Sequence, residues 1–107
     1  MSQVTSILAA EFDAFMEAAD KPVLIDFWAT WCGPCRALAP VVEQIAEEYA
    51  DTLIVGKVDI DDAPELVERY RLMSVPNVIL FKDGEPIAQS LGAVPKEALV
   101  KLLSEHL

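Results

Sequence analysis

The sequence predicts an α/β fold, because apolar runs typical of buried strands alternate with segments of helical periodicity. Residues 23–29 and 53–60 are almost continuously apolar, as expected for strands covered on both faces of a mainly parallel sheet. Between them, residues 34–49 place apolar side chains at a helical spacing. The 107 residues suffice for one core, so we expect a single domain over residues 1–107.

Two further elements precede these runs. Residues 4–8 form a weaker strand candidate. The segment after it predicts a helix, because its apolar side chains are spaced by three, four and seven residues: Phe12, Phe15, Met16 and Ala19. In the later helical segment, Pro40 lacks an N–H and should kink the helix.

A short helix is predicted after residue 60. Asp62 and Glu65 have the spacing of a capping pair, and the helix after them contains Leu66, Val67 and Tyr70. Residues 59–62 resemble the start of a calcium loop but lack its glycine and distal glutamate. We therefore interpret them as a strand end and a helix cap.

The last third of the chain predicts a hairpin and a helix. Residues 77–81 are a third buried strand, and Asp83-Gly84 after them is typical of a tight turn, so the last two strands are antiparallel. Pro86 makes the second of these an edge strand. Pro95 lies in the first turn of the final helix, whose inward side carries Leu99, Leu102 and Leu103.

Charge and hydropathy exclude some classes of partner. Eight basic and eighteen acidic residues give a net charge of -10, which repels a phosphate backbone and favours solubility, so no nucleic-acid partner is expected. The first lysine is Lys21, so no basic leader opens the chain, and no apolar run approaches the ~18 residues of a membrane span. We expect a cytoplasmic protein without membrane contact.

The segment Trp31-Cys32-Gly33-Pro34-Cys35 contains both cysteines. Two sulfurs at this spacing in the first turn of a helix can close a disulfide or open to a dithiol. The unpaired N–H groups and the dipole of that helix favour thiolate over thiol at Cys32. The sequence thus predicts an exposed nucleophile, Cys32, and a resolving partner, Cys35.

Zinc binding and a static disulfide are the alternatives for this pair. Zinc needs about four ligands, whereas the one histidine, His106, lies far away at the end of the chain, so no metal is expected. A bridge across so few residues constrains the unfolded chain weakly, which argues against a purely structural role.

Asp26 interrupts the apolar strand 23–29 on the face that also carries Trp28. Burial raises the pKa of a carboxyl above its usual ~3.9, and the cation of Lys57 opposes this; we expect burial to win. A structural ion pair with Lys57 is the alternative, but such pairs seldom repay their desolvation.

Trp28 is expected to pack under the cysteine turn. Trp31, within the turn, should be partly exposed and suited to peptide binding.

Together these residues resemble the thioredoxin family over essentially the whole chain. The resemblance is carried by the apolar strand 23–29 before the five-residue cysteine turn and by Pro40, Lys57, Val75-Pro76, Gly84 and Gly92. It implies a three-layer α/β/α fold with a mixed sheet of about five strands and four flanking helices. The cysteines would lie at the carboxyl end of the second strand.

The resemblance also implies roles for individual residues. Cys32 attacks a client disulfide and Cys35 resolves the mixed disulfide; Asp26 handles a proton through water, and Lys57 modulates it. A cis bond joins Val75 to Pro76, and the Val75 backbone pairs with an extended client segment. The docking surface also includes Trp31, Gly33, Pro34, Gly92 and Ala93, and the modulating residues also include Trp28, Gly33 and Pro34.

The implied function is a general protein-disulfide reductase, a monomer without bound cofactor that a separate thioredoxin reductase restores. A redox-independent interaction subunit is the alternative. An oxidase or isomerase is less favoured, because Gly33-Pro34 puts no cation between the cysteines. The family usually has Gly where this chain has Arg71, Arg or Lys where it has Met73, and Thr where it has Asn77. The preferences for clients and for a reductase therefore stay open. Arg36 replaces the usual lysine and keeps the charge beside Cys35.

Overall fold

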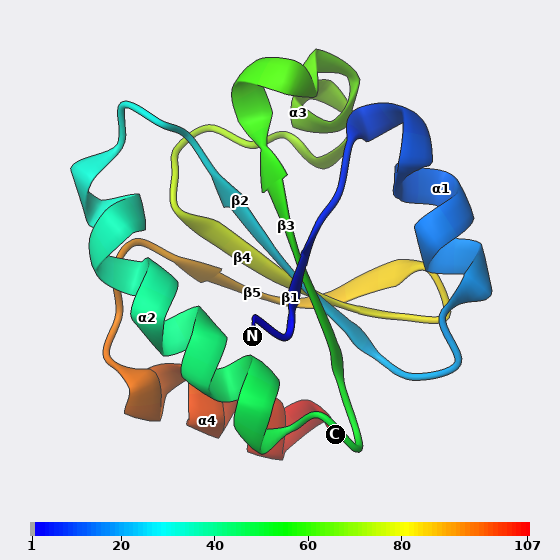
Figure 1. Cartoon of the computed structure of the whole chain (residues 1–107), viewed down its shortest axis with the longest axis vertical. Coiled ribbons are helices and arrows are strands. Elements are labelled where there is room, and N and C mark those ends of the chain that lie inside the picture. Colours follow the sequence, from blue (N-terminus) through cyan, green and yellow to red (C-terminus); the bar gives the residue numbers. More distant parts are fainter. Residues whose placement is uncertain (1) are drawn as a thin grey trace.

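A computed structural model describes residues 2–107 as a five-stranded sheet with helices on both faces (Figure 1). The elements are, in chain order, β1 (Val4–Ser6), α1 (Ala9–Ala18), β2 (Val23–Trp28), α2 (Gly33–Glu48), β3 (Ile54–Asp59), the 3-10 turn η1 (Ile60–Asp62), α3 (Pro64–Tyr70), β4 (Asn77–Lys82), β5 (Glu85–Leu91) and α4 (Lys96–His106). The strand order is β1-β3-β2-β4-β5.

The central strand is β2, which pairs with β3 in parallel and with β4 antiparallel. β1 joins the other side of β3 in parallel, and β5 joins β4 antiparallel at the far edge. The sheet is therefore mixed, and the predicted three-layer α/β/α fold is confirmed. Figure 1 shows α1 and α3 on one side of the sheet and α2 and α4 on the other.

Each face of the sheet covers its own apolar core. Under α1 and α3 an aromatic group packs with ring centroids 5.3 to 6.5 Å apart, formed by Phe12, Phe27, Tyr70 and Phe81. Under α2 and α4, Leu24 of β2 packs with Leu38 and with the buried Leu99 and Leu103 of the last helix. Leu102 is only partly buried against this core. These two cores cover β2 on both faces, as its continuous apolar sequence predicts.

The hairpin between β4 and β5 has the predicted turn. Asp83 and Gly84 both have positive φ, 54° and 80°, which is the backbone that a two-residue type I′ turn requires. β5 is an edge strand, as Pro86 predicts, and an extra residue in β5 shifts the ladder beside this proline.

Three helix starts differ from expectation. α3 begins at Pro64 with Ala63 as its N-cap, and no side chain caps it, so the predicted Asp62–Glu65 cap is wrong. Instead Asp59 accepts the N–H of Asp61 at 3.0 Å, which turns residues 60–62 into η1. Pro95 is the N-cap of α4 and lies just outside its first turn. α2 begins one residue before Pro34 and continues through Pro40.

Candidate active site at the start of α2

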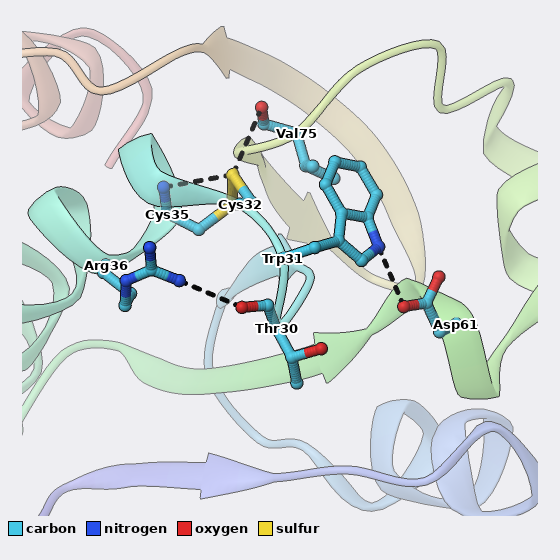
Figure 2. The surroundings of a disulfide bond; sticks show 7 residues. All are labelled: Thr30, Trp31, Cys32, Cys35, Arg36, Asp61 and Val75. Atoms are coloured by element: carbon cyan, nitrogen blue, oxygen red, sulfur yellow. Dashed lines mark hydrogen bonds between the residues drawn. A yellow bond between two sulfur atoms is a disulfide. The ribbon is translucent and has the colours of Figure 1, made fainter.

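Cys32 and Cys35 form a disulfide where β2 ends and α2 begins (Figure 2). Their Cα atoms are 5.3 Å apart. Cys32 is the N-cap of α2, and its Sγ accepts the backbone N–H of Cys35 at 3.1 Å. The N–H groups at a helix start have no partner within the helix, so this donor is available to a thiolate when the pair is reduced. The geometry favours negative charge on Cys32.

Two other segments meet the cysteine turn. The carbonyl oxygen of Val75 lies 3.7 Å from the Cys32 Sγ, and Val75 packs against the small buried cluster of Ala29, Cys32 and Cys35. The bond between Val75 and Pro76 is cis, as the resemblance implies. Gly92 donates its N–H to the carbonyl of Pro76 at 2.9 Å. The loops before β4 and after β5 are therefore tied together beside the disulfide.

Both cysteines are buried, which corrects the expectation that Cys32 is exposed. The exposed fractions are 4% for Cys32 and 3% for Cys35. The difference is too small to make one sulfur the accessible one. Trp28, Ile60 and Val75 pack against the buried cluster that the two cysteines form with Ala29. What distinguishes the two residues in this structure is the position of Cys32 at the helix start.

Asp26 lies in the middle of β2 and is 5% exposed. Burial raises the pKa of its carboxyl to about 6, although the cation of Lys57 lowers it. The predicted upward shift of this pKa is confirmed. Asp26 shares a face of β2 with Leu24, which packs under α2, the helix that carries Cys35. The protein thus keeps a carboxyl group that changes charge near neutral pH on the face that α2 covers.

Lys57 is the partner of Asp26 in the parallel register of β2 and β3. No ion pair joins these two side chains within the described chain, and the Asp26 Oδ1 has no hydrogen-bond partner there. The Nζ of Lys57 instead lies 5.8 Å from the centroid of the Trp28 ring. A closed structural ion pair therefore does not account for the buried carboxyl.

The two tryptophans differ as predicted. Trp28 is half-buried and packs against the cysteine pair, and its indole Nε1 has no hydrogen-bond partner among residues 2–107. Trp31 is 65% exposed. Its turn is held by Arg36, whose Nη1 donates to the carbonyl of Thr30 at 3.0 Å.

The other expected docking residues surround the disulfide with unequal exposure. Gly33, Pro34 and Ala93 are exposed, Gly92 is half-buried like Val75, and Pro76 is buried. Of the departures from the family pattern, Met73 is 92% exposed, whereas Asn77 is buried and accepts a hydrogen bond from Gln89 at 3.0 Å. Asn77 is therefore shielded from a docked client.

Sequence reasoning missed two residues of this region, Ile60 and Asp61. Ile60 packs against the cluster of Ala29, Cys32 and Cys35. The Oδ2 of Asp61 accepts the Trp31 Nε1–H at 3.0 Å (Figure 2). Both lie in η1, directly after β3. Since β2 and β3 are parallel neighbours, their carboxyl ends share one edge of the sheet. That signal could have placed residues 60 and 61 beside the cysteine turn.

Comparison with known proteins gives one consistent match. The Thioredoxin family model matches residues 3–105. The chain is 46% identical over 104 residues to thioredoxin from Mycobacterium bovis, covering 97% of this chain and 90% of that protein. It is 43% identical to Thioredoxin 1 from Synechococcus elongatus over 107 residues and the full length of both. A bifunctional thioredoxin reductase/thioredoxin from Mycobacterium leprae matches 90% of this chain at 47% identity, over 21% of its own length.

Proposed function

This chain belongs to the thioredoxin family and is a protein-disulfide oxidoreductase, a dithiol/disulfide reductase acting through Cys32 and Cys35, and from that premise we propose the role of each residue. Family members need no bound cofactor, because the cysteine pair itself carries the two electrons in its reduced dithiol form. The observation that carries the proposal is the hydrogen bond from the Cys35 N–H to the Cys32 Sγ at the start of α2. In a redox-independent subunit this bond would only cap the helix, whereas in a reductase it also stabilises the Cys32 thiolate.

In the first step, the Cys32 thiolate attacks one sulfur of a client disulfide. The client S–S bond breaks, a mixed disulfide forms with Cys32, and the second client sulfur leaves as a thiolate. The helix start stabilises the attacking thiolate before the step. The carbonyl of Val75, 3.7 Å from this sulfur, belongs to the loop on which the client docks.

In the second step, the Cys35 thiol loses its proton and attacks the Cys32 sulfur. This closes the internal disulfide and releases the reduced client. We assign Asp26 as the group that accepts this proton through water, because a buried carboxyl with a pKa of about 6 can hold or release a proton at neutral pH. Lys57 modulates Asp26 by favouring its charged form.

The client docks as an extended segment on the loops around the disulfide. Its main chain would pair with the backbone of Val75, which recognises peptide more than sequence. The apolar contacts come from residues beside that backbone, namely Trp31, Gly33, Pro34, Gly92 and Ala93. The buried Pro76 would shape the loop from beneath, and Trp28 would support the turn.

Thioredoxins work with a thioredoxin reductase, and one relative combines both in its name. We propose that a separate reductase returns the Cys32–Cys35 disulfide of this chain to the dithiol. We also propose that the protein acts as a monomer in the cytoplasm, where two cysteines are suited to exchange chemistry. Within residues 2–107, no helix is long and apolar enough to cross a membrane.

The roles of the two cysteines are tested by reduction of insulin with a reductase as electron source. Cys32→Ser should abolish turnover, because no attacking thiolate remains. Cys35→Ser should also stop turnover but accumulate protein joined to the client by a mixed disulfide. Full biological activity of the double Cys→Ser variant would instead support the redox-independent alternative.

A further inference from the structure

Trp31 combines high exposure with a fixed polar contact. Its side chain is 65% exposed, yet its Nε1–H donates to the Asp61 Oδ2 at 3.0 Å. Figure 2 shows the indole and this carboxylate facing each other from different segments of the chain. A hydrogen bond to a carboxylate is stronger than one between neutral groups, so it restricts a ring that exposure would otherwise leave mobile.

Asp61 is itself held by a rigid support. Its backbone N–H donates to the Asp59 Oδ1 at 3.0 Å, which closes η1 directly after β3. Ile60 in the same turn packs against both the cluster of Ala29, Cys32 and Cys35 and the core under α1 and α3. The parallel register places Asp59 opposite Trp28. The acceptor for the indole is thus fixed to the sheet rather than carried on a loose loop.

We propose that Asp61 is a positioning residue that holds Trp31 ready for client docking. This inference rests on the docking role proposed above for Trp31. Asp61 takes no part in the exchange between sulfurs, because the hydrogen bond that its side chain accepts comes from the indole of Trp31 and not from either cysteine. Asp61 restricts the rotation of the Trp31 side chain before the client binds, so that less conformational entropy is lost on binding.

The size of the effect follows from the freedom that Trp31 would regain. Fixing one mobile interface side chain weakens binding by a factor of about two to ten. Asp61→Ala should therefore raise the KM for a protein disulfide about two- to tenfold and leave kcat unchanged. A small aromatic disulfide, too short to reach the docking surface, should be reduced at the wild-type rate.

Matched variants separate positioning from other effects. Asp61→Asn keeps a carbonyl acceptor and should restore a KM within about twofold of wild type. Asp62→Ala removes the same charge from the same turn without touching Trp31 and should leave KM unchanged. In a Trp31→Phe background, which lacks the indole N–H, Asp61→Ala should raise KM no further. Relaxation of the Trp31 indole ¹⁵N should show greater mobility in Asp61→Ala only.

Three results would overturn the proposal. The Trp31 indole could stay as ordered in Asp61→Ala as in wild type, or become mobile while KM stays constant. Asp62→Ala could raise KM as much as Asp61→Ala, which would make the effect one of charge. The docking role itself is tested separately by Trp31→Ala: if that variant raises KM and Asp61→Ala does not, docking stands and the positioning role falls.

Discussion

At the scale of single residues, Asp26 shows how burial becomes chemistry. The Asp26 carboxyl is 5% exposed, forms no ion pair with Lys57 within the described residues and has a pKa of about 6. It is therefore costly to ionise at neutral pH. Stability alone does not account for such a group. The proposed role of Asp26 as proton acceptor for Cys35 would account for it, because such a group must be able to change charge under working conditions.

Asp26→Ala should stabilise the protein while slowing client release. The folded state holds the Asp26 proton more tightly than the unfolded chain does. The contribution of this proton to the free energy of unfolding is therefore complete below about pH 4 and is lost as pH rises through about 6. By linkage, a rise of the Asp26 pKa to about 6 corresponds to a loss of about 3 kcal/mol at pH 8, so the variant should be more stable than wild type by about 1–3 kcal/mol there.

Urea unfolding from pH 4 to 8 measures this gain, and insulin reduction measures the loss of turnover. Asp51→Ala, at an exposed position, controls for the loss of one negative charge. A variant less stable than wild type at pH 8 with unchanged turnover would make Asp26 a structural partner of Lys57.

The cysteines show where reasoning from sequence was incomplete. The helix start at Cys32 was predictable, because Gly33-Pro34 follows it and apolar periodicity begins there. Its burial was not predictable, because the covering residues Ile60 and Val75 come from distant parts of the chain. Selectivity between the two sulfurs must therefore come from charge stabilisation rather than from exposure.

Alkylation of the reduced protein tests this reasoning. Iodoacetamide near neutral pH should modify Cys32 well before Cys35, because the thiolate is the reacting form and the helix start favours it at Cys32. Raising the pH should narrow the difference, since Cys35 then also ionises. Peptide mapping after partial reaction measures the ratio; preferential labelling of Cys35 would reverse the assignment.

At the scale of elements, sequence patterns located every strand and α-helix but missed η1. Buried strands such as β2 and β3 were recognisable because short, continuous apolar runs rich in branched residues are typical of strands covered on both faces. The start of α3 was misplaced because Asp59, rather than Asp62, supplies the carboxylate that organises this turn. The hydrogen bond between Asp61 and Trp31 depends on the parallel neighbours β2 and β3, and no local pattern encodes it.

β3 also contains a glycine that close packing requires. A Cβ at Gly56 would lie 3.2 Å from the Ile25 Cδ1 and 3.3 Å from the Thr5 carbonyl oxygen, and closer still to the Ile7 Cδ1. Gly56→Ala should therefore destabilise the protein by about 1–3 kcal/mol. Ile7→Val removes the nearest obstructing atom and should recover part of the loss.

Urea denaturation of the single and double variants measures this coupling. Gly33→Ala is the control, because the nearest atom to a Cβ there is 3.8 Å away. If Gly56→Ala is as stable as wild type, the sheet relaxes around β3 more easily than its contacts indicate.

At the scale of the whole molecule, both apolar cores share one sheet. β2 contributes Leu24 to one face and Phe27 to the other, so neither core can be lost without exposing this strand. We propose that the chain unfolds as one cooperative domain. Urea transitions followed by tryptophan fluorescence and by far-UV circular dichroism should coincide; separate midpoints would mean that the two layers unfold independently.

The same sheet gathers the site. The carboxyl end of β2, the turn after β3 and the loops on either side of the β4–β5 hairpin meet at one edge, where the disulfide lies. This convergence brings the loops at Val75 and Gly92 beside the disulfide. In the proposed reaction, Cys32 forms the bond to the client and Cys35 breaks it.

The most direct test is mass spectrometry of the mixed disulfide trapped on the Cys35→Ser protein. Incubation of the reduced variant with a disulfide-bonded client, followed by acid quenching and digestion without reductant, identifies the residue joined to the client. We expect a bond between the client and Cys32, and no such bond in the Cys32→Ser protein. A stable adduct through Cys35 in the Cys32→Ser protein, formed as fast as the one through Cys32, would contradict it.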